Sequence, residues 1–268
     1  MKLLEGLDKF GLQDLENLEL YAQPKETPKK IEVKAFQIGS YVYEKEFTCP
    51  SCDSTFTGAV MRSGKMRPVS IDYDLRPIFR EPIQPVFYDV LICPRCGFAA
   101  LRRSFRPMSE WQRETIAALI TPRFKPVAYP LQLTLAMAIE RYKLALLCAM
   151  IRNARDGEKA YICMKLAWLS RSARDELSEM VYLQSAYTGF AAAYTKENFP
   201  ICGLDEHTVM YLMAAFAKAG ERYDEAMRLV GTLITDRTTP ARLKERARDL
   251  KASITAERNL KKSEEKES

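Results

Sequence analysis

Two short cysteine pairs constrain the fold of this chain more than any other feature. Residues 49–52 read Cys-Pro-Ser-Cys, and residues 93–96 read Cys-Pro-Arg-Cys. A Cys-x-x-Cys turn places two thiolates on one side of a tight loop, so two such turns supply the four sulfurs of a closed tetrahedral zinc site. A closed site leaves no position for water or substrate, which is typical of a structural metal. The sequence therefore predicts one structural Zn²⁺ held by Cys49, Cys52, Cys93 and Cys96.

The residues beside the cysteines favour the same turn geometry. Proline follows the first cysteine of each pair and fixes φ near about −65°. Gly97 follows the second pair and adopts positive φ at low cost, while Asp53 holds the equivalent place after the first pair and tolerates that region better than most residues. The spacer of residues 53–92 is longer than in compact four-cysteine modules, so we expect two zinc hairpins separated by a long insertion.

Two other chemistries fit these cysteines. A tetrahedral site of four thiolates also binds iron, and the Cys-Pro-x-Cys-Gly turn of residues 93–97 is similar to that of rubredoxins. One pair could instead form a redox disulfide, although that chemistry needs a thioredoxin-like βαβ context that the surrounding pattern lacks. Zinc is favoured over both because the ligand type and pairing match it best.

Composition indicates a folded protein of the cytoplasm. The chain has 268 residues, which is enough for two small domains or one elongated domain, and 47% of them are hydrophobic, which is ample for a core. No apolar run reaches the roughly 18 residues of a transmembrane helix, and the N-terminus lacks the apolar stretch of a signal peptide. Reduced thiols and no export signal predict a cytoplasmic location. The cysteines outside the two pairs lie among apolar helical residues, where a thiol behaves as a small hydrophobic group: Cys148, Cys163 and Cys202.

The residue pattern predicts an α+β fold in four segments. Residues 1–40 form an N-terminal arm with a short helix and a linker, and residues 41–106 form a small β-rich, zinc-ribbon-like Cys₄ module. Residues 107–256 form a larger all-α domain, and residues 257–268 form a charged, disordered tail. The expected strands are 31–48, 56–61, 86–92 and 98–101. The expected helices are 109–120, 131–153, 158–173, 176–197, 205–219, 222–236 and 240–258.

Small residues along these helices predict a tetratricopeptide-like stack. Ala138, Tyr142 and Ala145 reproduce the small–aromatic–small spacing of the second helix of a tetratricopeptide unit. Residues 164–169 and 211–216 also share a pattern of apolar and small side chains. Small residues at such spacings let helices approach closely. An irregular helical bundle would show the same stripes and is the alternative.

Two carboxylates in the insertion are candidate functional residues. Asp72 and Asp74 would lie on one face of an extended segment, because side chains alternate along a strand. They could contact a hard metal or a substrate. They could instead pair with Arg76 or Arg80 or cap local backbone. We favour the second interpretation because oxygen-ligand metal sites need more ligands than two carboxylates.

Several motifs occur together and in order. They are Phe-Thr-Cys-Pro-x-Cys at 47–52, Asp-x-Asp-Leu at 72–75, Pro-x-Phe-Tyr-Asp-Val at 85–90 and Cys-Pro-x-Cys-Gly-Phe-Ala at 93–99. With these motifs the chain resembles an uncharacterised bacterial family, domain of unknown function 2225, over roughly residues 45–240. The resemblance implies a bacterial cytoplasmic protein with a zinc-ribbon-type module followed by tetratricopeptide-like helices. It implies no activity, and Asp53 departs from the glycine of the family pattern.

The favoured function is a non-enzymatic scaffold or adaptor that binds a protein or peptide through its helical stack. Stacked helix pairs form extended concave surfaces, which suit such partners. Exposed aromatic residues could line this surface, although ordinary packing between helices is the simpler interpretation of each: Tyr182, Tyr187, Tyr194 and Tyr211.

A nucleic-acid-binding zinc ribbon is the second hypothesis. Basic and aromatic residues cluster near the second cysteine pair, a composition that suits single strands. Those residues are Arg95, Arg102, Arg103 and Arg106, with Phe98 and Phe105 between them. The net charge of +6 is modest, so the electrostatic contribution to binding would be weak.

An enzyme is the least favoured of the three classes. The chain has one histidine, His207, which follows two acidic residues at an expected helix start and there suits a surface or capping role. No Gly-rich phosphate loop, Ser-His-Asp set or His-x-Glu metal motif is visible. Four cysteine ligands would also deny the metal the open position that catalysis needs.

Overall fold

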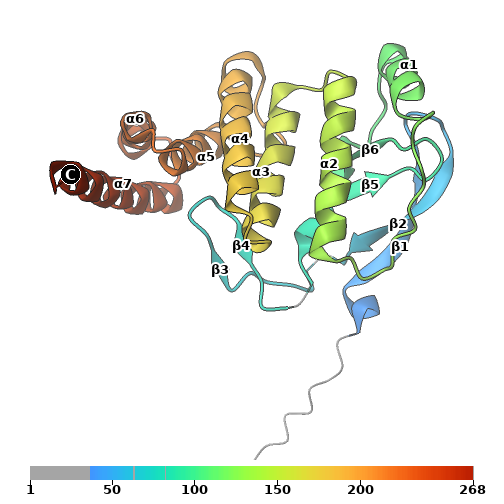
Figure 1. The fold of residues 1–268 in the computed structure, drawn as a ribbon, viewed down its shortest axis with the longest axis horizontal. Coiled ribbons are helices and arrows are strands. Elements are labelled where there is room, and N and C mark those ends of the chain that lie inside the picture. The colour runs from blue at the N-terminus through green and yellow to red at the C-terminus, as the bar shows by residue number, and fades with distance from the viewer. Residues whose placement is uncertain (1–36, 63, 82, 268) are drawn as a thin grey trace, which may run out of the picture. The chain divides into compact units, whose positions relative to one another are not determined.

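The computed structural model describes residues 37–62, 64–81 and 83–267, so nearly all of the predicted arm at 1–40 lies outside the described residues. Residues Ile38–Ser268 form one compact unit. Its fold is α+β, as predicted: among the described residues, three two-stranded antiparallel sheets precede seven α-helices (Figure 1).

Each cysteine pair lies at the tip of a β-hairpin. Strands β1 (Val42–Thr48) and β2 (Thr55–Met61) pair around the first turn. Strands β5 (Val90–Ile92) and β6 (Ala99–Leu101) pair around the second. The insertion between them contains one further hairpin, of β3 (Ser70–Ile71) and β4 (Pro77–Ile78). This arrangement confirms the prediction of two separate hairpins.

The predicted strand at 86–92 is wrong in its first half. Pro85–Tyr88 form a 3₁₀ turn, and β5 begins only at Val90. Pro85 stands at the start of the turn, where its fixed φ suits a helical conformation. The hydroxyl of the buried Tyr88 donates to Leu131 O at 3.0 Å and accepts from Leu133 N at 3.1 Å. Packing of Tyr88 against the chain before α2 therefore overrides the strand propensity of these aromatic and β-branched residues.

The helices match the predicted ranges closely. They are α1 (Glu110–Leu119), α2 (Leu135–Ile151), α3 (Asp156–Ser172), α4 (Glu176–Lys196), α5 (Glu206–Ala219), α6 (Tyr223–Thr235) and α7 (Ala241–Glu267). Side chains of Ser109, Thr134, Asp175 and Asp205 accept a hydrogen bond from a backbone N–H in the first turn of α1, α2, α4 and α5. Helix α7 continues through Glu267, so the expectation of a disordered tail from residue 257 is not met. Its last turns contain no Gly or Pro to end the helix.

One apolar core runs from the second hairpin into the helices. Helices α2, α3 and α4 lie side by side, and α2 packs against β5 and β6 (Figure 1). Tyr142 of α2 is fully buried, and its hydroxyl donates to Val86 O at 3.1 Å. Arg141 donates to Val90 O. The predicted boundary between 41–106 and 107–256 marks a change from strands to helices, but the core continues across it.

Candidate metal centre

The two cysteine turns have the same backbone geometry. Asp53 N donates to Cys49 O at 2.9 Å, and Gly97 N donates to Cys93 O at 3.0 Å. Asp53 has φ 56° and Gly97 has φ 77°, so both residues adopt the left-handed conformation that the sequence indicated. At the second turn only glycine fits, because a Cβ on Gly97 would lie 2.4 Å from Phe124 Cγ.

The four predicted ligands come together. Cys49 Sγ lies 3.6 Å from Cys96 Sγ, and Cys52 Sγ lies 3.7 Å from Cys93 Sγ. All four sulfurs lie within 4.8 Å of one another. A tetrahedral site with Zn–S bonds of about 2.3 Å has sulfur–sulfur edges of roughly 3.8 Å, close to the two shortest distances here, so these four thiols could hold a metal ion. Ser54 Oγ, which the sequence analysis missed, lies 3.0 Å from Cys52 Sγ and 3.4 Å from Cys93 Sγ.

Without a metal, the four thiols share protons among themselves. Hydrogen bonds from Cys49, and then from Cys96, lower the pKa of the Cys93 thiol, whereas the pKa of Cys49 and that of Cys96 are raised within the same cluster. A metal ion requires all of its sulfur ligands deprotonated, so its binding would release protons from this cluster.

Helix α1 and the chain that follows it cover the centre from the helical side. Arg113 of α1 forms an ion pair with Asp53 in the first turn. Thr121 Oγ1 donates to Cys96 O at 3.0 Å in the second turn. The helical region therefore contacts both turns, and the metal centre is not an isolated appendage.

The remaining cysteines behave as small hydrophobic groups. Burial raises the pKa of Cys148 and of Cys163 to about 11, and that of Cys202 to about 12. Cys148 lies on α2 behind the second turn, where its sulfur accepts from Ala99 N at 3.4 Å. These protonated thiols belong to the packing and not to the ligand set.

Asp72 and Asp74 pair with an arginine, as the favoured interpretation held, but the partner is Arg171 of α3. Asp72 Oδ2 lies 2.7 Å from Arg171 Nη1, and Asp74 Oδ2 lies 2.7 Å from Arg171 Nη2. Asp74 is fully buried and also accepts from Trp168 Nε1 at 3.0 Å. The expected arginines were wrong: among the described residues, neither carboxylate forms an ion pair with the side chain of Arg76 or of Arg80, which lie nearer in sequence. The expected capping of local backbone is confirmed, because Asp72 Oδ1 accepts from Tyr73 N at 2.9 Å and Asp74 Oδ1 accepts from Arg76 N at 3.4 Å.

Arg171 organises a wider cluster. Its Nε lies 2.7 Å from Glu179 Oε1, and its Nη2 donates to Tyr73 Oη at 2.8 Å. Tyr211 Oη of α5 donates to Tyr73 O at 2.8 Å. Burial opposes the charge on Arg171, yet the hydrogen bond and charge of Asp74 dominate and raise its pKa. One guanidinium thus binds the β3–β4 hairpin to α3 and α4, which leaves these carboxylates engaged and not vacant for a hard metal.

Lys165 of α3 is a buried ionisable residue that sequence reasoning missed. It is 9% exposed, and its Nζ lies 4.0 Å from the centre of the Trp168 ring. None of the described residues forms an ion pair with it, and burial lowers its pKa to about 8. It lines a cavity of about 350 Å³ together with Asp89 and Trp168. A lysine in a helical pattern is normally assigned to solvent, so only the packing reveals this position.

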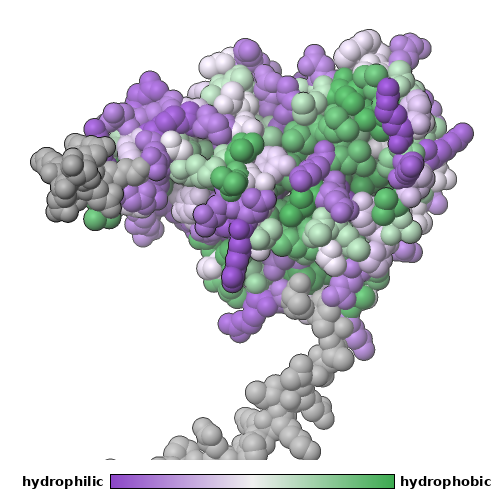
Figure 2. Space-filling view, in the orientation of Figure 1, coloured by the Kyte–Doolittle hydropathy of each residue, from purple (hydrophilic) through white to green (hydrophobic). Residues whose placement is uncertain are grey.

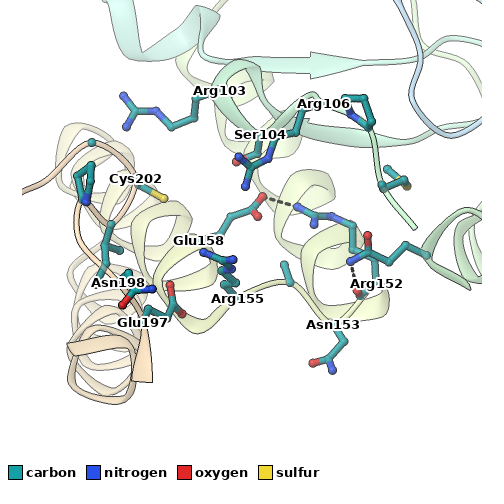
Figure 3. Close-up of a pocket in the computed structure, with 17 residues that line it drawn as sticks. Arg103, Ser104, Arg106, Arg152, Asn153, Arg155, Glu158, Glu197, Asn198 and Cys202 are labelled. Carbon is teal, nitrogen blue, oxygen red and sulfur yellow. Dashed lines mark hydrogen bonds and ion pairs between the residues drawn. The ribbon is translucent and has the colours of Figure 1, made fainter. Parts of the chain in front are cut away.

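The two aromatic residues of the nucleic-acid hypothesis take different positions. Phe98 is fully buried, whereas Phe105 is half-buried and packs with its ring centroid 5.4 Å from that of Phe98. Arg103 and Arg106 line a polar pocket formed with the helical region (Figure 3). Of the predicted pair of stacking aromatics, only Phe105 therefore retains some exposure.

The tyrosines and the histidine take largely structural positions. Tyr187 and Tyr211 are buried, so packing and not a binding surface explains them. Tyr194 Oη donates to Glu206 Oε1 at 2.6 Å, whereas Tyr182 is partly exposed. His207 Nε2 lies 2.9 Å from Asp236 Oδ2, which links the start of α5 to the end of α6.

A family model described as "Uncharacterized protein conserved in bacteria (DUF2225)" matches residues 42–254. The match includes both cysteine turns, the Arg171 cluster and the helices from α1 into α7. No curated protein and no solved structure matches the chain. Within the described residues, no helix combines the length and the apolar character needed to cross a membrane. The chain belongs to the family of uncharacterised conserved bacterial proteins known as domain of unknown function 2225.

Proposed function

We propose that this protein is a non-enzymatic, zinc-stabilised scaffold or adaptor that docks an amphipathic helix of a partner protein on the outer face of α2, α3 and α4. The observation that carries the proposal is a groove of about 430 Å³ over α3, with α2 and α4 as its walls. Figure 2 shows hydrophobic residues gathered over α2 and the adjoining part of α3. A groove between two roughly parallel helices suits a third helix.

The walls of this groove carry apolar side chains at helical spacing. On α4, Leu177 and Val181 are 84% and 63% exposed and continue the face that includes Gln184 and Thr188 in the groove. On α2, Met150 is 61% exposed and lines the groove directly. Exposed apolar side chains that follow one groove mark an interaction surface, because burying them on a partner is favourable.

The metal, on this proposal, is Zn²⁺ with a structural role. Four thiolate ligands match zinc and leave no open coordination position, which supports a binding protein over an enzyme. The hairpin that carries two of the ligands packs on α2, so the ion would hold one wall of the groove in place. None of the seven cysteines forms a disulfide, which supports a reducing compartment such as the cytoplasm.

Introducing negative charge at the apolar groove tests the proposal. Met150→Glu places a carboxylate on the α2 wall, and Val181→Glu places one on the same face of α4, one turn before the groove residue Ser185. Both positions are exposed, so folding should be unaffected. Val69→Glu is the matched control, because Val69 is 57% exposed but lies in the insertion, outside the groove. Each protein is cross-linked to its partners in a bacterial lysate. We expect wild type and the control to recover a partner protein bound through a helical segment, and both groove variants to lose it. Equal recovery from all four proteins would refute the docking role.

A further inference from the structure

A second cavity, polar and larger, lies at the junction of three chain segments. It encloses about 670 Å³ between residues 103–108, the α2–α3 turn at 152–155 and the α4–α5 connection at 197–203 (Figure 3). Its size is within the range of roughly 300–1,000 Å³ that is typical of small-molecule sites. Four arginines line it: Arg103, Arg106, Arg152 and Arg155.

The two carboxylates in this cavity are already engaged. Glu158 forms an ion pair with the buried Arg152, and Figure 3 shows this pair pointing at each other across the turn. Glu197 accepts from Gly157 N at 2.9 Å and so caps the first turn of α3. One arginine is therefore neutralised. Glu197 keeps its negative charge but forms no ion pair with an arginine of the cavity, and because the arginines outnumber the carboxylates the cavity keeps a net positive charge.

The remaining arginines have no acidic partner. Arg106 and Arg155 are exposed, and within the described residues no side chain forms an ion pair or hydrogen bond with their guanidinium groups. Arg103 lies over the ring of Tyr161, 4.8 Å from its centroid, a contact that orients the guanidinium group without cancelling its charge. Three cationic groups around one cavity create a local positive potential that an anion would relieve.

We propose that this cavity binds a small phosphate-bearing ligand, with Arg106 and Arg155 contacting the phosphate and Arg103 beside them. Guanidinium groups recognise phosphate through paired, charge-assisted hydrogen bonds. The other lining groups include Ser104, Asn153 and Asn198, which can hydrogen-bond a hydrophilic ligand body. The arginines come from both the strand-rich and the helical parts of the chain, so the site exists only in the folded unit.

Pyrophosphate is the probe for a calorimetric titration at constant ionic strength. We expect saturable binding to the full chain, and a loss of about tenfold or more in affinity for Arg106→Ala and for Arg155→Ala, because each removes a charge-assisted contact. Arg95→Ala is the matched control. Arg95 is an exposed arginine of the second cysteine turn that does not line the cavity, so this variant should bind like wild type.

Three results would overturn the proposal. The first is no saturable binding of pyrophosphate to wild type. The second is an equal loss of affinity in Arg95→Ala, which would mean that only net charge matters. The third is citrate binding as tightly as pyrophosphate, which would exclude phosphate as the recognised group. The substituted side chains are exposed, so far-ultraviolet circular dichroism should be unchanged in every variant.

Discussion

The four-cysteine centre and the Arg171 cluster both hold the strand-rich part of the chain together, by different physical means. The cysteines would act through a metal ion. Its binding free energy adds directly to the free energy of folding, because the unfolded chain has no preformed site. Arg171 acts through buried charge, where the attraction between partners largely offsets the cost of removing them from water. The metal centre is therefore expected to raise the free energy of unfolding. The Arg171 cluster is expected mainly to disfavour other conformations of the insertion, because they would leave its buried charges unpaired.

Removing the metal should have the largest effect. Structural zinc sites contribute on the order of 10 kcal/mol, so chelation or Cys93→Ser should unfold both cysteine hairpins. Because β5 and β6 pack on α2, we expect α2 to lose protection as well, while α5 to α7 keep theirs. Hydrogen exchange measured by mass spectrometry would resolve the helices one by one, and elemental analysis should find about one zinc per wild-type chain.

Cys163→Ser is the control for that experiment. Cys163 is a buried thiol of α3 outside the ligand set, so the variant should retain its zinc. Stoichiometric iron in place of zinc would correct the assignment of the metal. Unchanged hydrogen exchange in the hairpins after metal loss would show that the apolar core alone is sufficient to keep them folded.

Breaking the Arg171 cluster should rank second. Arg171→Met leaves Asp74 fully buried without its cationic partner, and such a change costs about 3–5 kcal/mol. Urea unfolding followed by fluorescence would measure the loss. Adding Asp72→Asn and Asp74→Asn to Arg171→Met should recover part of it, because the stranded charges are then removed.

Arg113→Ala provides the comparison on the other side of the molecule. Its ion pair with Asp53 is largely exposed, with side-chain exposures of 40% and 66%, so the loss of stability should be much smaller than that of Arg171→Met. Similar losses of stability in Arg113→Ala and Arg171→Met would mean that burial does not determine how much each ion pair contributes.

The pH dependence contributed by Lys165 should be the smallest of these effects. Burial lowers the pKa of Lys165 from 10.5 to about 8, so between these values the unfolded chain binds more protons than the folded one. The free energy of unfolding should therefore rise with pH across this window, by about 1–3 kcal/mol. Lys165→Met should lack this rise, and the difference between the two proteins cancels the other titrating groups. Parallel pH profiles for both would show that Lys165 titrates normally.

Much of the fold could be predicted because it depends on local signals. Capping side chains such as Ser109 and Asp205 and the periodic apolar residues place the helices within a few residues. The error at 86–92 arose where Tyr88 hydrogen-bonds to residues far along the chain. The missed tail arose because charged composition alone does not distinguish an exposed helix from disorder.

The sequence by itself identified the four cysteines that come together, because two cysteines separated by two residues in one turn are typical of a metal-binding pair. It also determined the order of strands and helices. Only the tertiary structure decided which arginine pairs with Asp72. Arg171 lies 99 residues away in the sequence, and several nearer arginines were equally plausible partners. The same holds for the burial of Lys165 and for the cavity that joins Arg106 to Arg155. These features depend on which distant surfaces pack together, and that is set by the whole core rather than by any segment of it.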